Sequence, residues 1–287
     1  MNVSVIIPTL NAERWLNRQL SCLLSQTIEA EIIVIDSGSA DATPAIAERY
    51  APRVRLIEIP EKDFDHGGTR DFALRQSGGD IVLFLTQDAL PMDNHYIEKL
   101  LVPFADERVA AVFGRQIAWP DAPAYECLTR LFNYPETGRI WREADIPRYG
   151  VKSYFFSNSC SAIRRAAYEA VGGFETPIVT NEDMILAAKL LHAGWSLAYQ
   201  PESAVRHSHV DTLAGEYTRN VKIGRVMEQY REILTGAPPT GEGLRMVRFV
   251  SRELLRKGRI GEIPVFLAHA AVRFAGYRAG KRQWNKR

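Results

Sequence analysis

Three side chains that follow apolar segments are candidate ligands of a metal ion. Asp88 lies two residues after the apolar run 81–86 (IVLFLT). A carboxylate there must be solvated, paired or bound to a metal, because burying an isolated charge is costly. His207 and His209 follow a later apolar segment, and they either ligate the same ion or are structural. Proteins usually hold hard cations such as Mg²⁺ or Mn²⁺ through carboxylates and substrate phosphates. The sequence therefore predicts a divalent-cation site with Asp88 as its anionic ligand.

The segment 65–70 (DHGGTR) has the composition of a phosphate-binding turn. Gly67 and Gly68 would let the backbone approach an anion closely. Thr69 would cap a helix whose N-terminus attracts phosphate, and Arg70 adds a fixed cation. An ordinary glycine turn beside a solvated arginine has the same residues, so the segment alone leaves both interpretations open.

Three further carboxylates lie where they could act on a bound substrate. Asp36, at the end of an expected strand, either accepts hydrogen bonds from a nucleobase or ribose or forms the turn before Gly38. Glu182 and Asp183 lie in the first turn of an expected helix, whose dipole favours their ionised form. Adjacent helical residues point about 100° apart, so only one of them can face a site and accept a proton from a hydroxyl. Ordinary acidity at a helix N-terminus is the alternative.

The elements that would position these residues alternate between short apolar runs and amphipathic stretches, which predicts βαβ units and an α/β fold. The expected strands are 3–8, 31–36, 54–59, 81–86 and 109–114. Ligands of an open parallel sheet bind beyond the carboxyl ends of its strands, where the polar residues named above gather. We expect a catalytic domain over residues 1–212 and a helical extension over 213–287.

Residues 115–150 show no clear period and contain five aromatic side chains, which predicts a long ordered excursion over the sheet. The excursion either forms part of an acceptor pocket or covers apolar surface. Its aromatic residues are Trp119, Tyr125, Phe132, Tyr134 and Trp141.

Composition and cysteine content bound the class of protein. Of 287 residues, 46% are hydrophobic and 24% are charged, which is typical of a globular chain and excludes a disordered one. Cys22, Cys127 and Cys160 are odd in number and form no CxxC pair, so we expect buried, reduced residues. There is neither an apolar run of membrane-spanning length nor a basic, apolar signal peptide at the start, and we therefore expect a cytosolic location.

The charge is distributed unevenly along the chain. Residues 244–287 contain 12 Lys and Arg against 2 Asp and Glu, whereas the preceding residues contain 24 against 32. An acidic body excludes the usual profile of a nucleic-acid-binding protein. The basic tail either contacts an anionic membrane surface or is a solvated helix or an oligomer contact.

GxGxxG and GxxxxGK[ST] motifs are both absent, which argues against a dinucleotide-binding fold and a P-loop.

In combination these segments resemble the family 2 glycosyltransferases, inverting enzymes of the GT-A fold. The resemblance spans roughly residues 3 to 210 and rests on VSVIIPTLN, EIIVIDSGSADAT, GDIVLFLTQDA, GGF, NEDM and the histidine pair. FDHGGTRD is also similar to the HGxTRN signature of a bacterial rhamnosyltransferase branch. That branch transfers rhamnose from dTDP-rhamnose to a glycan or lipid-linked glycan acceptor in surface-polysaccharide assembly.

The resemblance implies a role for each matching position. Asp183 would be the catalytic base, and Asp88 with His207 or His209 would bind the Mg²⁺ or Mn²⁺ that bridges the diphosphate. Acceptor contacts are expected from Trp119 and Glu182. Nucleotide and donor contacts are expected from Pro8, Thr9, Asn11, Asp36, Gly67, Arg70 and Gln87.

Two positions depart from the family pattern. Thr86 stands where the DxD motif has its first carboxylate, which leaves Asp88 as one anionic ligand. Asp71 stands where the rhamnosyl signature has asparagine. A non-catalytic nucleotide-sugar-binding protein and a transferase that uses another UDP- or GDP-sugar are therefore the alternatives. A sugar-nucleotide-forming nucleotidyltransferase shares the fold but needs a Gly-rich basic loop after the first strand, where this chain has PTLN.

Overall fold

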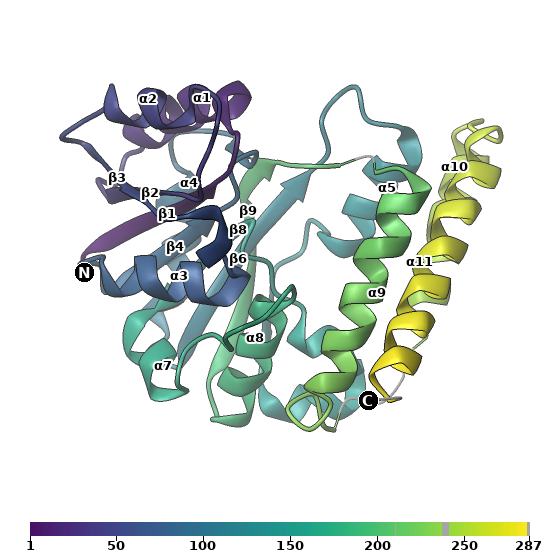
Figure 1. Ribbon diagram of the computed structural model, residues 1–287. Helices are drawn as coiled ribbons and strands as arrows, with labels where there is room; N and C mark the ends of the chain where they lie inside the picture. The colour runs from purple at the N-terminus through teal and green to yellow at the C-terminus, as the bar shows by residue number, and fades with distance from the viewer. Residues whose placement is uncertain (210, 237–240, 286–287) are drawn as a thin grey trace.

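The computed structural model describes residues 1–209, 211–236 and 241–285, and a nine-stranded sheet lies at the centre of this part of the chain (Figure 1). Its strand order is β3-β2-β1-β4-β8-β6-β9-β5, and β7 also pairs with β9. The strands are β1 (Val3–Thr9), β2 (Glu31–Asp36), β3 (Val54–Glu58), β4 (Ile81–Leu85), β5 (Leu90–Pro91), β6 (Val109–Ile117), β7 (Arg139–Trp141), β8 (Cys160–Arg164) and β9 (Ser196–Arg206).

The first half of the sheet is the parallel structure that the sequence predicts. β1 pairs in parallel with β2 and β4, and β2 with β3. In the second half, β8 runs antiparallel between β4 and β6, whereas β6 and β9 are parallel. The short strands β5 and β7 lie antiparallel to β9. All five predicted strands are present, and residues 196–206 form one further long strand, β9.

Helices cover both faces of the sheet, because successive residues of a strand point to opposite sides. In β4, Val82 and Phe84 join the apolar cluster under α3, α7 and α8, while Ile81, Leu83 and Leu85 join the cluster under α1, α2 and α4. These helices are α1 (Glu13–Leu24), α2 (Thr43–Glu48), α3 (His66–Arg75), α4 (Tyr96–Leu101), α7 (Arg165–Ala170) and α8 (Glu182–His192).

The stretch 115–150, expected as an irregular excursion, is more regular than predicted. β6 continues to Ile117, and α5 (Ala124–Asn133), β7 and α6 (Ile146–Tyr149) follow. Tyr134 and Trp141 are buried against Phe113 of β6, so part of the stretch covers the core. The remaining short elements are 3₁₀ helices at Glu61–Asp63, Val102–Ala105, Glu143–Asp145 and Gly150–Tyr154.

Three helices follow the sheet: α9 (Leu213–Gln229), α10 (Glu242–Arg256) and α11 (Glu262–Trp284). α9 and α11 run side by side (Figure 1), and their backbones approach closely at glycines. A Cβ on Gly224 would overlap the carbonyl oxygen of Tyr277, and one on Gly280 that of Val221. Among the described residues, no helix is both long and apolar enough to cross a membrane.

The C-terminal helices pack against α5 rather than standing free. Tyr125 and Leu128 of α5 form a third apolar cluster with Val250, Leu254 and Phe266. The Tyr125 backbone N–H donates to the Glu262 carboxylate at 3.0 Å. Residues of α10 and α11 therefore share an apolar core with α5, which precedes β9 in the chain.

The three cysteines are unpaired, as predicted, but they are not all buried. Cys160 lies in the core, Cys22 is half-buried and Cys127 is exposed. Cys127 lies on α5, on the side away from the third cluster, so its exposure corrects the expectation for that residue.

Candidate active site

Loops from both halves of the sheet meet at one edge. Leu85 at the end of β4 lies opposite Cys160 at the start of β8, so the loop 86–88 adjoins the loop 157–159. Ile117 pairs with Arg206 where β6 and β9 end. The predicted site residues after these strands therefore share one edge of the sheet, where ligands of this kind of fold bind.

A cavity of about 310 Å³ opens at the carboxyl end of β1. It is lined by four of the predicted donor-binding residues, Pro8, Thr9, Arg70 and Gln87, and by Leu10, Ser37, Glu61, Phe64, His66 and Thr86. The Gln87 amide exchanges two hydrogen bonds with the Leu10 backbone, at 2.8 and 3.1 Å. Ser37 Oγ, Thr86 Oγ1 and Arg70 Nε are buried and have no hydrogen-bond partner in the described part of the chain. Because buried polar atoms are normally paired, these atoms favour a polar ligand here.

A buried ion pair holds Arg70 at the cavity. Its Nη1 lies 3.2 Å from Glu182 Oε1, and both side chains are less than a tenth exposed. The same Nη1 donates to the His66 carbonyl at 2.9 Å, and Asn158 Nδ2 donates to Glu182 Oε1 at 3.2 Å. The carboxylate of Glu182 thus orients Arg70, and the predicted acceptor contact of Glu182 stays a prediction.

Asp36 and Asn11, expected to contact the nucleotide, connect two loops to each other. Asp36 is 1% exposed, and its carboxylate accepts hydrogen bonds from Thr9 Oγ1 at 2.9 Å and from Ser39 Oγ at 2.6 Å. Asn11 Oδ1 accepts from the Ala40 backbone at 2.9 Å. Neither side chain is among the residues that line the 310 Å³ cavity. Both fix the loops that form its wall, and their predicted nucleotide contacts stay predictions.

Helix α3 begins before the glycines of the 65–70 segment, not after them. Asp65 is the N-cap and accepts a hydrogen bond from the Gly68 N–H, which corrects the prediction that Thr69 caps the helix. A Cβ on Gly67 would overlap the carbonyl oxygen of Glu175. Contact with the chain itself therefore requires a glycine at position 67, and the predicted donor contact of Gly67 stays a prediction.

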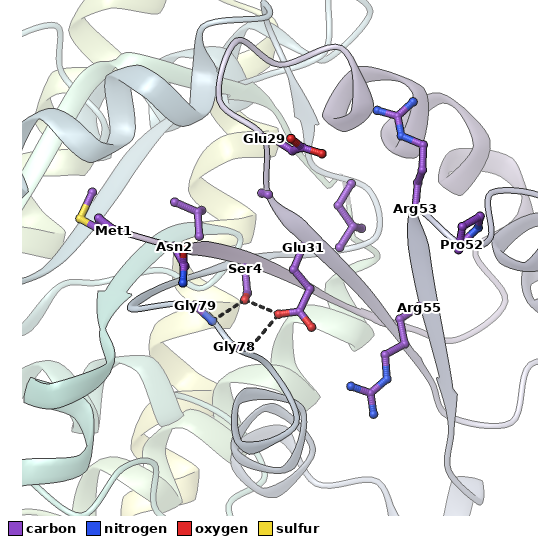
Figure 2. Close-up of a pocket in the computed structure, with 13 residues that line it drawn as sticks. Met1, Asn2, Ser4, Glu29, Glu31, Pro52, Arg53, Arg55, Gly78 and Gly79 are labelled. Carbon is purple, nitrogen blue, oxygen red and sulfur yellow. Dashed lines mark hydrogen bonds between the residues drawn. The ribbon is translucent and has the colours of Figure 1, made fainter.

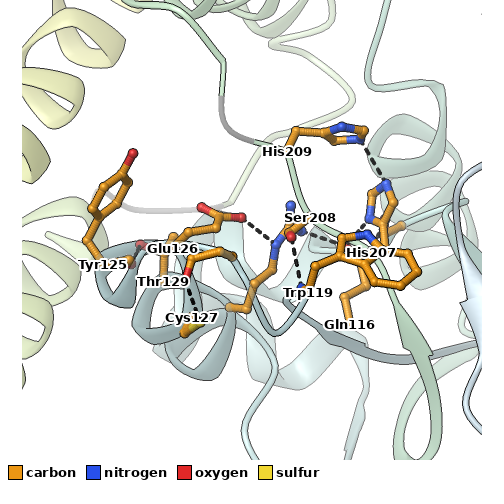
Figure 3. Close-up of polar contacts among 12 residues, drawn as sticks. Gln116, Trp119, Tyr125, Glu126, Cys127, Thr129, His207, Ser208 and His209 are labelled. Atoms are coloured by element: carbon orange, nitrogen blue, oxygen red, sulfur yellow. Dashed lines mark hydrogen bonds and ion pairs between the residues drawn. The ribbon is translucent and has the colours of Figure 1, made fainter.

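Asp88, His207 and His209 come together as candidate metal ligands. His207 Nε2 lies 3.4 Å from Asp88 Oδ1, and His209 Nε2 lies 3.0 Å from Asp88 Oδ2. One ligand atom from each residue lies within 4.8 Å of the others, and Figure 3 shows the two imidazoles side by side. One carboxylate and two imidazoles are a donor set that fits a divalent transition-metal ion with positions left for phosphate oxygens.

Burial and pairing favour the metal-binding protonation states of two candidate ligands, Asp88 and His207. Burial lowers the pKa of His207, against the opposing effect of Asp88. Burial also acts to raise the pKa of Asp88, but its close contacts with the His207 and His209 side chains hold that pKa well below its usual value. At neutral pH His207 is neutral and Asp88 is ionised, which are the forms that bind metal ions.

Asp183 has the environment of a general base. Its Oδ2 accepts a hydrogen bond from the Asn158 backbone at 3.1 Å, and its Oδ1 accepts one from the Met184 backbone at 2.8 Å. Burial, and then the negative charge of Glu182, raises the pKa of Asp183 to about 7. A base with a pKa near the working pH transfers protons most effectively. Asn158 lies in the loop beside Asp88, so base and metal ligands share one edge.

Trp119 lies beside the metal ligands on the same edge. Its ring stacks on the ring of Trp15 with centroids 5.2 Å apart, and its backbone N–H donates to Ser208 Oγ at 3.1 Å. It also lines a cavity of about 170 Å³ together with Arg130 and Arg206. The acceptor role of Trp119 stays a prediction.

A larger cavity, of about 690 Å³, lies at the opposite edge of the sheet, at the amino ends of β1 and β2 (Figure 2). Its polar groups bind one another: Ser4 Oγ donates to Glu31 Oε2 at 2.6 Å and accepts from the Gly79 N–H at 2.9 Å. The candidate catalytic and metal-binding residues all lie at the other edge of the sheet, so the volume of a cavity alone does not identify the active site.

Sequence reasoning missed three residues of the site. Gln116 and Arg130 lie behind His207, and His66 lies between the 310 Å³ cavity and a second one of about 510 Å³. Burial lowers the pKa of His66, which keeps its ring neutral. Gln116 could have been recognised in the sequence as a polar residue near the end of the apolar strand β6 (VAAVFGRQI).

Comparisons with known proteins agree with this geometry. Residues 4–172 match Glycosyl transferase family 2. The chain is 37% identical to O-antigen chain rhamnosyltransferase RfbN of Salmonella typhimurium, over 98% of this chain and 90% of that relative. It is 38% identical to O-antigen chain rhamnosyltransferase WbaN of Salmonella anatum, over 97% of this chain and 89% of that relative.

Solved structures confirm the predicted GT-A fold. Mannosyltransferase PcManGT from Pyrobaculum calidifontis, in complex with GDP-Man and Mn²⁺, superposes with a TM-score of 0.70 at 18% identity, covering 100% of this chain and 88% of that one. S. aureus TarS 1-349 in complex with UDP superposes with a TM-score of 0.62 at 17% identity, covering 100% and 92%. With the family match and the two relatives that align over nearly the whole chain, these findings show that the protein belongs to glycosyl transferase family 2.

Proposed function

We propose that the protein transfers rhamnose from dTDP-rhamnose to a hydroxyl of a glycan or lipid-linked glycan acceptor in cell-surface polysaccharide synthesis, with inversion at the anomeric carbon. The observation that carries the chemistry is Asp183, a carboxyl with a pKa of about 7 on the same edge as the Asp88 cluster. Both Salmonella relatives are named as O-antigen chain rhamnosyltransferases, which supports rhamnose as the sugar.

The reaction follows from this placement. Asp183 takes the proton of the acceptor hydroxyl, whose oxygen forms the new bond to the anomeric carbon. The bond from that carbon to the diphosphate breaks, and its electron pair leaves with the nucleoside diphosphate. Arg70, fixed by Glu182, supports the developing charge at the cavity. A bound divalent cation would supply further neutralisation of the diphosphate.

The donor set favours Mn²⁺ over Mg²⁺. His207 and His209 offer imidazole nitrogens, which suit transition-metal ions, whereas Mg²⁺ prefers oxygen ligands. PcManGT, which shares the fold, was solved with Mn²⁺. We therefore expect Mn²⁺ to support donor binding better than Mg²⁺.

The acceptor is proposed to enter by the 510 Å³ cavity. This cavity lies between His66, the Val179–Thr180 segment that precedes the base, and the first turns of α9, which contribute Arg219 and Lys222. The cationic side chains suit an acceptor that carries phosphate, as a lipid-linked glycan does. His66 lines both cavities, so donor and acceptor would meet beside it.

A thermal-shift screen of nucleotide sugars tests the donor. With Mn²⁺ and ligand at about 100 times the Kd, dTDP-rhamnose should stabilise the protein by about 2.7 kcal/mol, a rise of roughly 5 °C in Tm. The Asp88→Asn variant is the control and should lose the Mn²⁺-dependent part of the rise. A larger shift with a UDP- or GDP-sugar would replace the donor assignment. Binding without acceptor-dependent release of dTDP would instead indicate a non-catalytic binding protein.

The turn between α10 and α11 supports the predicted contact with an anionic membrane. Residues 255–260 (LRKGRI) are all exposed, with Leu255 at 55% and Ile260 at 61%. Apolar side chains beside three cations are typical of a surface that binds anionic lipid, where each cation contributes about 1 kcal/mol.

This turn lies on the same side of the molecule as the edge of the sheet where the candidate active site is. Arg273 of α11 pairs with Glu216 in the first turn of α9, which directly follows the histidine pair. α11 begins at Glu262, so its start extends about three turns beyond that contact. A docked turn would bring the active-site edge toward lipid headgroups and a lipid-linked acceptor.

Vesicle co-sedimentation tests the membrane contact. The full chain should bind vesicles that contain phosphatidylglycerol and not vesicles of phosphatidylcholine alone. Reversing Arg256, Lys257 and Arg259 to glutamate should weaken binding about 100-fold or more, because at least three lipid contacts are lost. A matched reversal at the exposed residues Arg18, Arg49 and Arg108 is the control. Equal binding by both triple variants would contradict the proposal.

A further inference from the structure

Behind His207 lies a buried polar chain that no step described above uses (Figure 3). Gln116 is 2% exposed, and its Oε1 faces two groups: Arg130 Nη1 at 2.6 Å and His207 Nδ1 at 2.9 Å. Arg130 is held in turn by Glu126, whose Oε1 accepts from Arg130 Nε at 2.9 Å. The other end of the Gln116 amide donates to Ser157 Oγ at 2.9 Å.

The orientation of the Gln116 amide is decided by Arg130. A guanidinium carries only donors, so the amide atom that faces Arg130 must be the oxygen. His207 Nδ1 faces that same oxygen and must therefore carry the hydrogen. A neutral imidazole with its hydrogen on Nδ1 keeps a free lone pair on Nε2, the atom that lies 3.4 Å from Asp88 Oδ1.

We propose that Gln116 is a positioning residue that holds His207 in the Nδ1–H form and so presents Nε2 to the divalent cation of the donor complex. This inference rests on the proposed function, because it assigns His207 as a ligand. The contacts of His209 agree with it: His209 Nε2 lies 3.1 Å from His207 Nε2 and can donate to that lone pair when no cation is bound. Partners behind a metal ligand commonly change metal affinity by about 10- to 100-fold.

The Gln116 amide also connects the candidate metal ligand His207 with the loop that contacts the candidate base Asp183. Ser157, which accepts from Gln116, precedes Asn158, whose N–H binds Asp183. Glu126 balances the charge of Arg130, so a cation can lie behind His207 without repelling a second cation in front of it. In the described part of the chain, His207 Nδ1 has no hydrogen-bond partner other than Gln116.

The first test measures Mn²⁺ binding directly, from the electron paramagnetic resonance signal of free Mn²⁺ in the presence of dTDP. Gln116→Leu removes the acceptor and should weaken Mn²⁺ about 10- to 100-fold, with dTDP affinity in the absence of metal little changed. Gln116→Glu keeps an oxygen for Arg130 and His207 and should stay within a few-fold of the native enzyme. Gln76→Leu, on the exposed end of α3, is the matched control.

The second test observes the protonation of the His207 ring nitrogens directly. In the metal-free native protein with ¹⁵N-labelled histidine, the nitrogen shifts of His207 should be those of the Nδ1–H form, and they should change in Gln116→Leu. An Nε2–H form in the native protein, or native Mn²⁺ affinity in a folded Gln116→Leu variant, would overturn the inference. Failure of the native enzyme to bind Mn²⁺ would overturn the metal part of the proposed function as well, so the two failures are distinguishable.

Discussion

Asp183→Asn should lower turnover by about 10²- to 10⁴-fold, because an amide of the same shape cannot take the proton of the acceptor hydroxyl. Binding of dTDP should change little, since Asp183 is not among the residues that line the donor cavity. The measurement is acceptor-dependent release of dTDP, with dTDP affinity determined separately. Asp106→Asn, a surface change next to Arg108, is the matched control. Turnover within a few-fold of the native rate would show that another group is the base.

The pH dependence of the native enzyme follows from the same residue. The base works only when deprotonated, and burial together with Glu182 raises the pKa of Asp183 to about 7. Its deprotonated fraction therefore grows as pH rises through 7, so turnover should be low at pH 5.5, half-maximal near pH 7 and level above about pH 8. A pH profile of turnover at saturating donor checks this, and a midpoint near pH 4 would contradict it.

Asp88→Asn should lower turnover by about 10²- to 10³-fold, because the site loses the one anionic ligand that holds the cation against the diphosphate. Removing the cation from the native enzyme with EDTA should have a similar effect, which Mn²⁺ should reverse in the native enzyme and not in the variant. Asp93→Asn, which changes an exposed pair with Lys99, is the matched control. Full activity of Asp88→Asn in EDTA would show that transfer proceeds without the metal.

The framework of the fold could be predicted from apolar patterning because the central strands have no competing pattern. Residues 31–36 (EIIVID) form β2 with the expected bounds. α5 was missed because prolines precede it, and because its apolar face is covered by α10 and α11, which are distant in sequence. The N-cap of α3 was placed four residues late, at Thr69 instead of Asp65, since nothing in the sequence shows that the Asp65 side chain reaches the Gly68 N–H.

The site was predictable where a residue's type and its place at a strand end limit its chemistry. Asp88, His207 and His209 lie together because they follow β4 and β9 at one edge of the sheet. The pairing of Glu182 with Arg70 could not be predicted, because sequence cannot tell which of two adjacent carboxylates meets a buried arginine. The hydroxyl partners of Asp36 could not be predicted either, because one comes from β1 and the other from a loop whose path depends on the whole fold.

The shared core of α5, α10 and α11 limits how members of this family can be recombined. A chimaera that exchanges only the residues after the histidine pair would leave Tyr125 and Leu128 against foreign side chains. Any shift of α5 would carry Arg130 with it, away from Gln116. Grafts meant to alter acceptor choice therefore need to bring α5 along with the C-terminal helices.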